Sequence, residues 1–133
     1  AYGAGRVGTL EAPVSLRQFA EKVKSVLGLP AVRLGGSPES PVRTVAVCGG
    51  SGADFWKDAL QAGADTFITG DLKYHTAQDM LAAGLNFIDP GHYGTEAVVL
   101  PVLHRFLVRR CRENNMDVEI LLAQTNTDPF AYL

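Results

Sequence analysis

Three short apolar runs, each closed by a turn and separated by helical segments, constrain the fold more than any other feature. The runs cover residues 44–48, 65–69 and 85–88, and helical patterns at 53–62 and 72–83 lie between them. Short apolar strands alternating with helices of about ten to fifteen residues indicate βαβ units and a parallel sheet. Right-handed crossovers would place the helices on both faces. We therefore predict an α/β fold, a layered sandwich with a largely parallel sheet and helices on both faces.

The segments on either side of these units predict further elements. Ser15 and Gln18 have the spacing of a capping box, and Gly28 followed by Pro30 ends the helix that begins there. Short strands are expected at residues 6–10, 31–34 and 118–123, and a long helix at 93–112. Pro101 lies inside that last helix and should kink it or move its start later in the chain.

Length and charge limit the classes of function. A chain of 133 residues is long enough for one domain with its own core. With a net charge of −2 it has no broad basic face, so we do not expect it to bind nucleic acid. Four arginines form one basic cluster at helical spacing, which we interpret as a solvated helix face: Arg105, Arg109, Arg110 and Arg112.

Cysteine use and hydropathy indicate the cellular setting. The two cysteines, Cys48 and Cys111, are too few for a disulfide framework and form no CxxC pair. Cys48 lies in an apolar run, where it is expected to be a small buried side chain. No apolar stretch has the length of a membrane span, so no membrane partner is expected. A reducing cytoplasm is the simplest location for such a chain.

Residues with chemical potential gather after the three central strands. The turns that follow these strands contain glycines 49, 50 and 52, then Asp71, then His92. The carboxyl ends of parallel strands share one edge of a sheet, so the three turns should line one cleft. His92 and Glu96 are four residues apart, which places them on one helical face as half of a metal site. The alternative is structural: His92 caps or hydrogen-bonds the turn, and Glu96 lies in the first helical turn, where the helix dipole favours an acid.

Two further patterns keep both a structural and a chemical interpretation. Asp71 could act as a helix N-cap and His75 could be an exposed helical residue, or both could serve chemistry in the cleft. The glycine turn at residues 49–52 could hold a phosphate on its amide groups or be a tight turn. It is neither a P-loop nor a dinucleotide fingerprint, since GK[ST] and GxGxxG are both absent.

Several of these stretches occur in an order that resembles one family. The chain resembles the carboxyl-terminal part of the Ngg-one-interacting-factor-three-like family, also known as GTP cyclohydrolase I type 2 homologues. The matching stretches span nearly the whole chain: residues 3–8 (GAGRVG), 45–52 (VAVCGGSG), 64–75 (ADTFITGDLKYH), 89–96 (DPGHYGTE) and 128–130 (DPF).

The resemblance implies a dinuclear metal centre of which this chain supplies part. In that family two divalent ions, such as Zn, Mn, Fe, Ni or Co, lie in a cleft, and a His-His pair and an Asp come from the amino-terminal half. His92 and Glu96 match the ligands from the carboxyl-terminal half. Asp71 and His75 match a stretch of the same cleft, where we expect catalytic roles in orienting ligands or moving protons. No adjacent His-His pair exists in this sequence. Residues 1–133 are therefore expected to form a single α/β domain, the carboxyl-terminal part of a larger protein whose amino-terminal half is absent.

Three functions follow as expectations. The first is a metal-dependent hydrolase resembling GTP cyclohydrolase I type 2, acting on a nucleotide or another phosphorylated small molecule. The alternative is a non-catalytic metal-binding module for protein interaction. The third class is a nucleotide-binding domain that uses the turn at residues 49–52. The resemblance also implies a ring-like homohexamer, and we expect a cytoplasmic protein.

Overall fold

The three central apolar runs form the parallel core of a five-stranded sheet. In the computed structural model, which describes residues 3–133, these strands are β3 (Pro41–Val47), β4 (Thr66–Ile68) and β5 (Asn86–Asp89). β3 and β5 both pair in parallel with β4. This confirms the predicted α/β class and the parallel centre of its sheet. Residues 1–2 of the predicted domain lie outside the described residues.

Both edges of the sheet are antiparallel, which makes it a mixed sheet. β1 (Arg6–Ser15) pairs antiparallel with β3, and β2 (Arg33–Gly35) pairs antiparallel with β5, in the order β1-β3-β4-β5-β2. The β1–β3 register shifts between Thr9 and Val14. β1 is longer than the predicted strand at 6–10 because it continues past this irregularity. Strand direction at the edges was not predicted, since an apolar pattern carries no direction.

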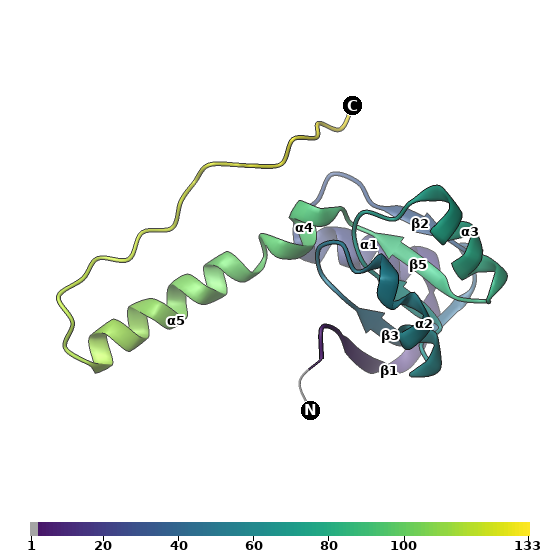
Figure 1. Cartoon of the computed structure of the whole chain (residues 1–133), viewed down its shortest axis with the longest axis horizontal. Helices are drawn as coiled ribbons and strands as arrows, with labels where there is room; N and C mark the ends of the chain where they lie inside the picture. Colours follow the sequence, from purple (N-terminus) through teal and green to yellow (C-terminus); the bar gives the residue numbers. More distant parts are fainter. Residues whose placement is uncertain (1–2) are drawn as a thin grey trace.

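Helices cover both faces of the sheet, as predicted (Figure 1). On one face α1 (Leu16–Leu27) packs its apolar side on buried side chains of β3, β4 and β5, including Val42, Ile68 and Ile88. On the other face lie the short 3-10 helix η1 (Ala53–Phe55), α2 (Trp56–Gln61) and α3 (Tyr74–Ala82), packed on Ala46, Phe67 and Phe87. Burying each large apolar side chain contributes about 1.5–3 kcal/mol, so the packing on both faces stabilises the sheet between the two helical layers.

The ends of α1 follow the sequence prediction. The Ser15 hydroxyl accepts the amide N–H of Gln18, and the Gln18 side chain accepts the amide N–H of Ser15. Gly28 ends the helix with φ 65°, a left-handed conformation that costs glycine little. The capping box and the glycine stop are therefore both confirmed.

The predicted long helix is divided in two. α4 (His92–Glu96) follows β5 directly, and α5 (Val99–Glu113) starts afterwards. Pro101 is the third residue of α5, within the first turn, where its missing N–H has no intrahelical partner to lose. The proline thus moves the start of the helix, one of the two outcomes expected for it.

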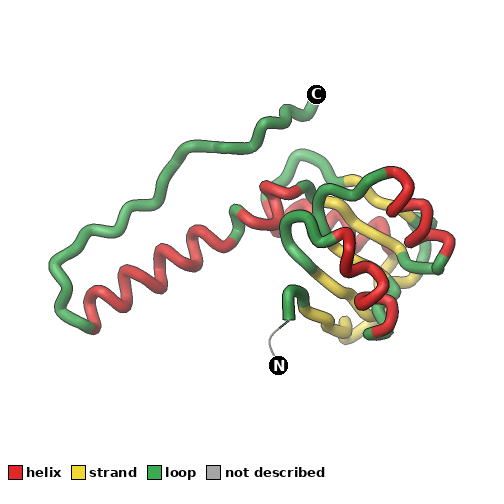
Figure 2. The backbone as a smooth tube through the Cα atoms, in the orientation of Figure 1, coloured by secondary structure: helices red, strands yellow, loops and turns green. Residues whose placement is uncertain are grey.

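α5 and residues 114–133 form an arm that extends away from the sheet (Figures 1 and 2). The chain turns at the far end of α5 and comes back beside it to the body of the molecule. One contact between the two limbs joins the His104 ring to the Ile120 carbonyl at 3.0 Å. Apolar side chains of α5 are largely exposed: Val99, Leu100, Val102, Leu103, Phe106 and Leu107.

The strand predicted at 118–123 is wrong for this structure. Those residues are extended but have no strand assignment and no sheet partner among residues 3–133. A strand needs a neighbouring strand for its backbone groups, and the returning limb lies beside a helix instead. Within the described residues no helix is both long enough and apolar enough to span a bilayer.

Candidate functional site

The three turns at the carboxyl ends of β3, β4 and β5 are interlocked. The Gly50 amide donates to the Thr95 hydroxyl at 2.8 Å, and the Gly70 amide donates to the Gly50 carbonyl at 2.9 Å. The Thr69 hydroxyl accepts the Gly52 amide at 2.9 Å. The prediction that the strand-end turns share one edge is confirmed by these contacts.

Gly50 leaves room for two site residues. It has φ +64°, and a Cβ placed there would lie 2.4 Å from the Glu96 carboxylate and 3.4 Å from the His92 ring. A larger residue would therefore displace the Glu96 side chain as well as strain the backbone. The turn at residues 49–52 therefore packs against His92 and Glu96, which favours the interpretation of this turn as structural over that as a phosphate site.

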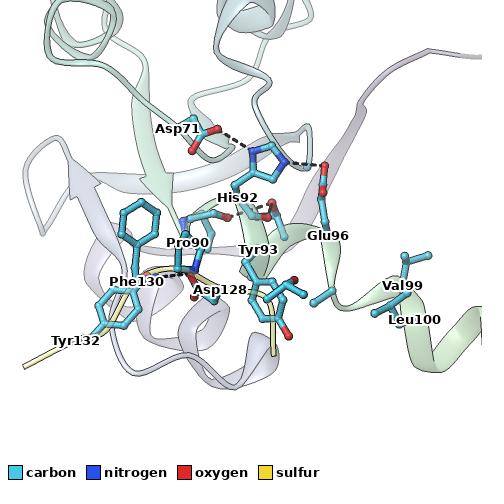
Figure 3. Close-up of a pocket in the computed structure, with 17 residues that line it drawn as sticks. Asp71, Pro90, His92, Tyr93, Glu96, Val99, Leu100, Asp128, Phe130 and Tyr132 are labelled. Atoms are coloured by element: carbon cyan, nitrogen blue, oxygen red, sulfur yellow. Dashed lines mark hydrogen bonds and ion pairs between the residues drawn. The ribbon is translucent and has the colours of Figure 1, made fainter. Parts of the chain in front are cut away.

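His92 lies between two carboxylates (Figure 3). Its Nδ1 is 2.7 Å from Asp71 Oδ2, and its Nε2 is 3.2 Å from Glu96 Oε1. All three side chains are about half exposed, with 46–60% of their surface accessible. The ring is thus fixed at one nitrogen and presents the other, together with Glu96, to solvent.

The carboxylates change the acidity of the imidazole. The hydrogen bond that the ring donates to Asp71 is the main reason that the pKa of His92 is raised above its ordinary value of 6.5. Desolvation lowers this pKa in part, and the negative charge of Glu96 raises it again. Without a cation between them, His92 and Glu96 therefore attract each other most strongly when the ring is protonated.

Asp71 does not cap α3 as its position suggested. The N-cap of α3 is Lys73, without a side-chain hydrogen bond, and Asp71 lies two residues earlier with φ 57°. A left-handed conformation costs a non-glycine residue on the order of 1–2 kcal/mol. This backbone turns the Asp71 carboxylate toward His92 instead of toward the helix.

His75 lies apart from this group. It sits in the first turn of α3, and its ring packs edge-on against Tyr74 with the centroids 5.3 Å apart. It does not line the cleft described below. The structure therefore brings together Asp71, His92 and Glu96, and it places His75 outside their hydrogen-bonded group.

A cleft of about 860 Å³ opens beside His92. Its walls come from the β5–α4 turn, the start of α5 and the end of the returning limb, including Tyr93, Asp128, Phe130 and Tyr132 (Figure 3). This volume is within the range of small-molecule sites. The tail residues around Phe130 belong to the cleft, although no role could be assigned to them from spacing alone.

The donor atoms fit part of a divalent metal site. A neutral imidazole with Nδ1–H donated to Asp71 offers its Nε2 lone pair on the side where Glu96 offers an oxygen. Carboxylate support of a metal-binding histidine is a common arrangement, since it fixes the tautomer and the ring orientation. Throughout the region from Gly3 to Leu133 no group of three or more His, Cys, Asp or Glu side chains is arranged to hold an ion. A site made of His92 and Glu96 would therefore need further ligands from outside the described residues.

Asp89 and Arg33 were not predicted as site residues. Asp89 ends β5, is 3% exposed, and accepts the amide N–H of Gly91 at 2.8 Å. An acid before Pro-Gly is typical of a turn in which the side chain bonds two residues ahead, so this contact could have been predicted. Its pairing with Arg33 joins residues 56 positions apart and leaves no local pattern in the sequence.

The family model for Duf34/NIF3 (NGG1p interacting factor 3) matches residues 1–129. The chain belongs to this family. Among curated relatives, the GTP cyclohydrolase 1 type 2 homologues of Bacillus subtilis and Streptococcus pneumoniae are each 41% identical to it. These matches cover 98% of the chain but only 35% and 50% of the two relatives, in their carboxyl-terminal part.

A solved structure supports the same fold. The crystal structure of a Bacillus cereus protein related to NIF3 is 37% identical, with a TM-score of 0.93 over 98% of this chain and 36% of its own. The family resemblance and its carboxyl-terminal location are thereby confirmed. The residues of the Duf34/NIF3 chain that meet at the strand ends come from the 45–52, 64–75 and 89–96 stretches.

Proposed function

We propose that this Duf34/NIF3 chain supplies one half of a dinuclear metal site in a metal-dependent hydrolase. The observation that carries the proposal is the arrangement of His92, fixed at Nδ1 by Asp71 and facing Glu96 through Nε2. His92 and Glu96 would be the ligands from this chain, for Zn, Mn, Fe, Ni or Co. Asp71 orients the ring, and the remaining ligands would come from the rest of a longer protein.

The cleft beside His92 supports a small-molecule substrate. A divalent metal held by His92 and Glu96 would supply a bound water of lowered pKa. The adjoining cleft of about 860 Å³ has room for a nucleotide or another phosphorylated small molecule. The relatives' name, GTP cyclohydrolase 1 type 2 homologue, is consistent with a nucleotide as the substrate.

A cytoplasmic location is part of this proposal. The assignment of a proton-transfer role to His75 stays a prediction.

Metal binding is tested by titration calorimetry with Zn²⁺ and Mn²⁺ at neutral pH. We expect His92→Gln and Glu96→Gln each to weaken binding at least tenfold. His75→Gln is the matched control, because it removes an imidazole that packs on Tyr74 and lies outside the group of Asp71, His92 and Glu96. Equal affinities in wild type, His92→Gln and His75→Gln would refute the assignment of ligands. A full-length relative, such as the Bacillus subtilis protein, should retain about two ions per chain after dialysis.

A second candidate function is a non-catalytic metal-binding module for protein interaction. The exposed apolar side chains of α5 favour it, because patches of this kind mark interaction surfaces. The partner we propose is another copy of the chain, in a ring-like homo-oligomer. Sedimentation should then give a mass above that of one chain, reduced by Phe106→Glu. A monomer at all concentrations, together with nucleotide turnover that depends on His92, would exclude this alternative.

A further inference from the structure

Asp89 is the buried charged side chain closest to the candidate metal site. It is the last residue of β5, and its side chain is 1% exposed. A buried carboxylate is costly unless hydrogen bonds and opposite charge compensate it. Asp89 has both, since it accepts two backbone amides and pairs with the Arg33 guanidinium.

The two amides that Asp89 accepts belong to different turns. Oδ2 accepts the Leu72 amide at 3.2 Å, directly after Asp71. Oδ1 accepts the Gly91 amide at 2.8 Å, directly before His92. One carboxylate therefore ties the turn that carries Asp71 to the turn that carries His92.

Arg33 completes the contact from β2. Its guanidinium pairs with Asp89 and also donates to the Leu72 carbonyl at 3.2 Å. Both the amide and the carbonyl of Leu72 are thus held, while its side chain is buried in the core. This fixes the backbone next to Asp71 at the point where Asp71 has the left-handed φ of 57°. An unfavourable conformation persists only where its surroundings determine it.

We propose that Asp89, together with Arg33, is a positioning residue that holds Asp71 against His92. Asp89 and Arg33 act indirectly, because their hydrogen bonds go to each other and to the backbone of Leu72 and Gly91. The effect passes through the backbone of Leu72 to Asp71, and through Gly91 to His92. The expected effect of Asp89 on metal binding rests on the proposed function. Its effect on the contact between Asp71 and His92 does not, because that contact needs no metal.

The test compares Asp89→Asn with Asp65→Asn. The Asp65 carboxylate also accepts two backbone amides, of Arg43 and Thr44 at 2.8 and 2.7 Å, but next to the opposite end of β4. Asparagine keeps the shape of either side chain and leaves one oxygen to accept a hydrogen bond. At Asp89 the two amides bond different oxygens, so the NH₂ group of asparagine faces one of them and that amide loses its partner. At Asp65 both amides bond Oδ2, so an asparagine oxygen there keeps both, and the variant loses only the negative charge and the acceptor of the Thr66 hydroxyl. Both variants should lose stability, and the difference between them isolates the effect on the site.

Two measurements on the whole chain distinguish positioning from stability. The first is the NMR signature of the His92 ring, whose Nδ1–H is shifted downfield when it is donated to Asp71. We expect this signature to be lost in Asp89→Asn, as in Asp71→Ala, and kept in Asp65→Asn. The second is the dissociation constant for Zn²⁺, expected to rise about tenfold in Asp89→Asn alone, at the lower end of the range for residues that orient ligands.

The inference is overturned if Asp89→Asn keeps the His92 signature and binds Zn²⁺ within twofold of Asp65→Asn. If Asp89→Asn does not fold, Arg33→Gln replaces it, because the Arg33 side chain is 68% exposed and the Asp89 carboxylate keeps its two backbone amide donors. An unchanged His92 signature in Arg33→Gln would then overturn the proposal. If neither the wild-type chain nor a full-length relative binds Zn²⁺, the proposed function fails, while the NMR comparison still decides the role of Asp89.

Discussion

Replacing Gly50 by alanine should weaken metal binding by more than the strain it introduces can explain. Gly50 has φ +64°, a conformation that costs alanine about 1–2 kcal/mol relative to glycine. The added methyl group would also lie 2.4 Å from Glu96 Oε1, well inside contact distance. The Glu96 carboxylate is the mobile end of an exposed side chain, so it should move aside rather than unfold the turn. Moving it separates the Glu96 oxygen from His92 Nε2.

The chain contains a matched control for this substitution. Gly63 has φ +80°, and no atom lies within 4 Å of a Cβ placed there. Gly63→Ala therefore introduces similar backbone strain without touching the site. We expect both variants to lose about 1–2 kcal/mol in denaturant unfolding. Only Gly50→Ala should raise the Zn²⁺ dissociation constant, by about ten-fold or more, as is usual when the orientation of a ligand is disturbed.

Calorimetric titration of the two variants with Zn²⁺ decides the question. If Gly50→Ala binds Zn²⁺ as tightly as Gly63→Ala, then Glu96 either is not a ligand or does not need the position seen here. Gly50 would then not be needed to keep Glu96 in place. A loss of Zn²⁺ affinity in both variants would instead point to global destabilisation. Measuring the free energy of unfolding on the same samples separates these outcomes.

Five further outcomes are expected. Asp71→Asn should lower the pKa of His92 in an NMR titration, since its hydrogen bond is the main cause of the raised value. Because the folded state raises the pKa of His92, the stabilisation that the protonated ring gains from Asp71 and Glu96 is present below about pH 6.5 and is lost as pH rises through the raised pKa. Denaturant unfolding at several pH values measures this loss. Met80→Ala should cost about 2–5 kcal/mol of unfolding free energy, because Met80 is the fully buried side chain by which α3 packs on the core. Ser15→Ala should cost about 1 kcal/mol through loss of its cap, whereas Phe106→Glu on the exposed arm should change stability by less than about 0.5 kcal/mol.

Local patterns predicted the body of this molecule well. The alternation of apolar runs and helices gave the parallel centre, and the Ser15–Gln18 spacing gave the start of α1. Both are short-range effects, in which neighbouring residues decide the backbone conformation. The same logic brought Asp71 and His92 to one edge, because strands in parallel must end on the same side.

Contacts between distant residues could not be predicted in the same way. The pairing of Arg33 with Asp89 depends on β2 lying antiparallel beside β5, and a three-residue strand has no pattern that states its direction. For Asp71 the sequence left two interpretations open: an N-cap, which is the usual preference of an acid before a helix, and a chemical role in the cleft. The left-handed backbone and the nearby imidazole outweigh that preference, and both depend on tertiary structure.

The irregular outer strands also determine how this sheet can meet other chains. On β1 the register is interrupted between Thr9 and Val14, and the interruption contains Glu11 and Pro13. Proline has no amide hydrogen to donate, and a charged side chain opposes the approach of another apolar strand. At the opposite side β2 is only three residues long and offers little backbone to pair. Extension of the sheet from copy to copy, the route by which many β-rich proteins aggregate, is therefore disfavoured at both of its edges.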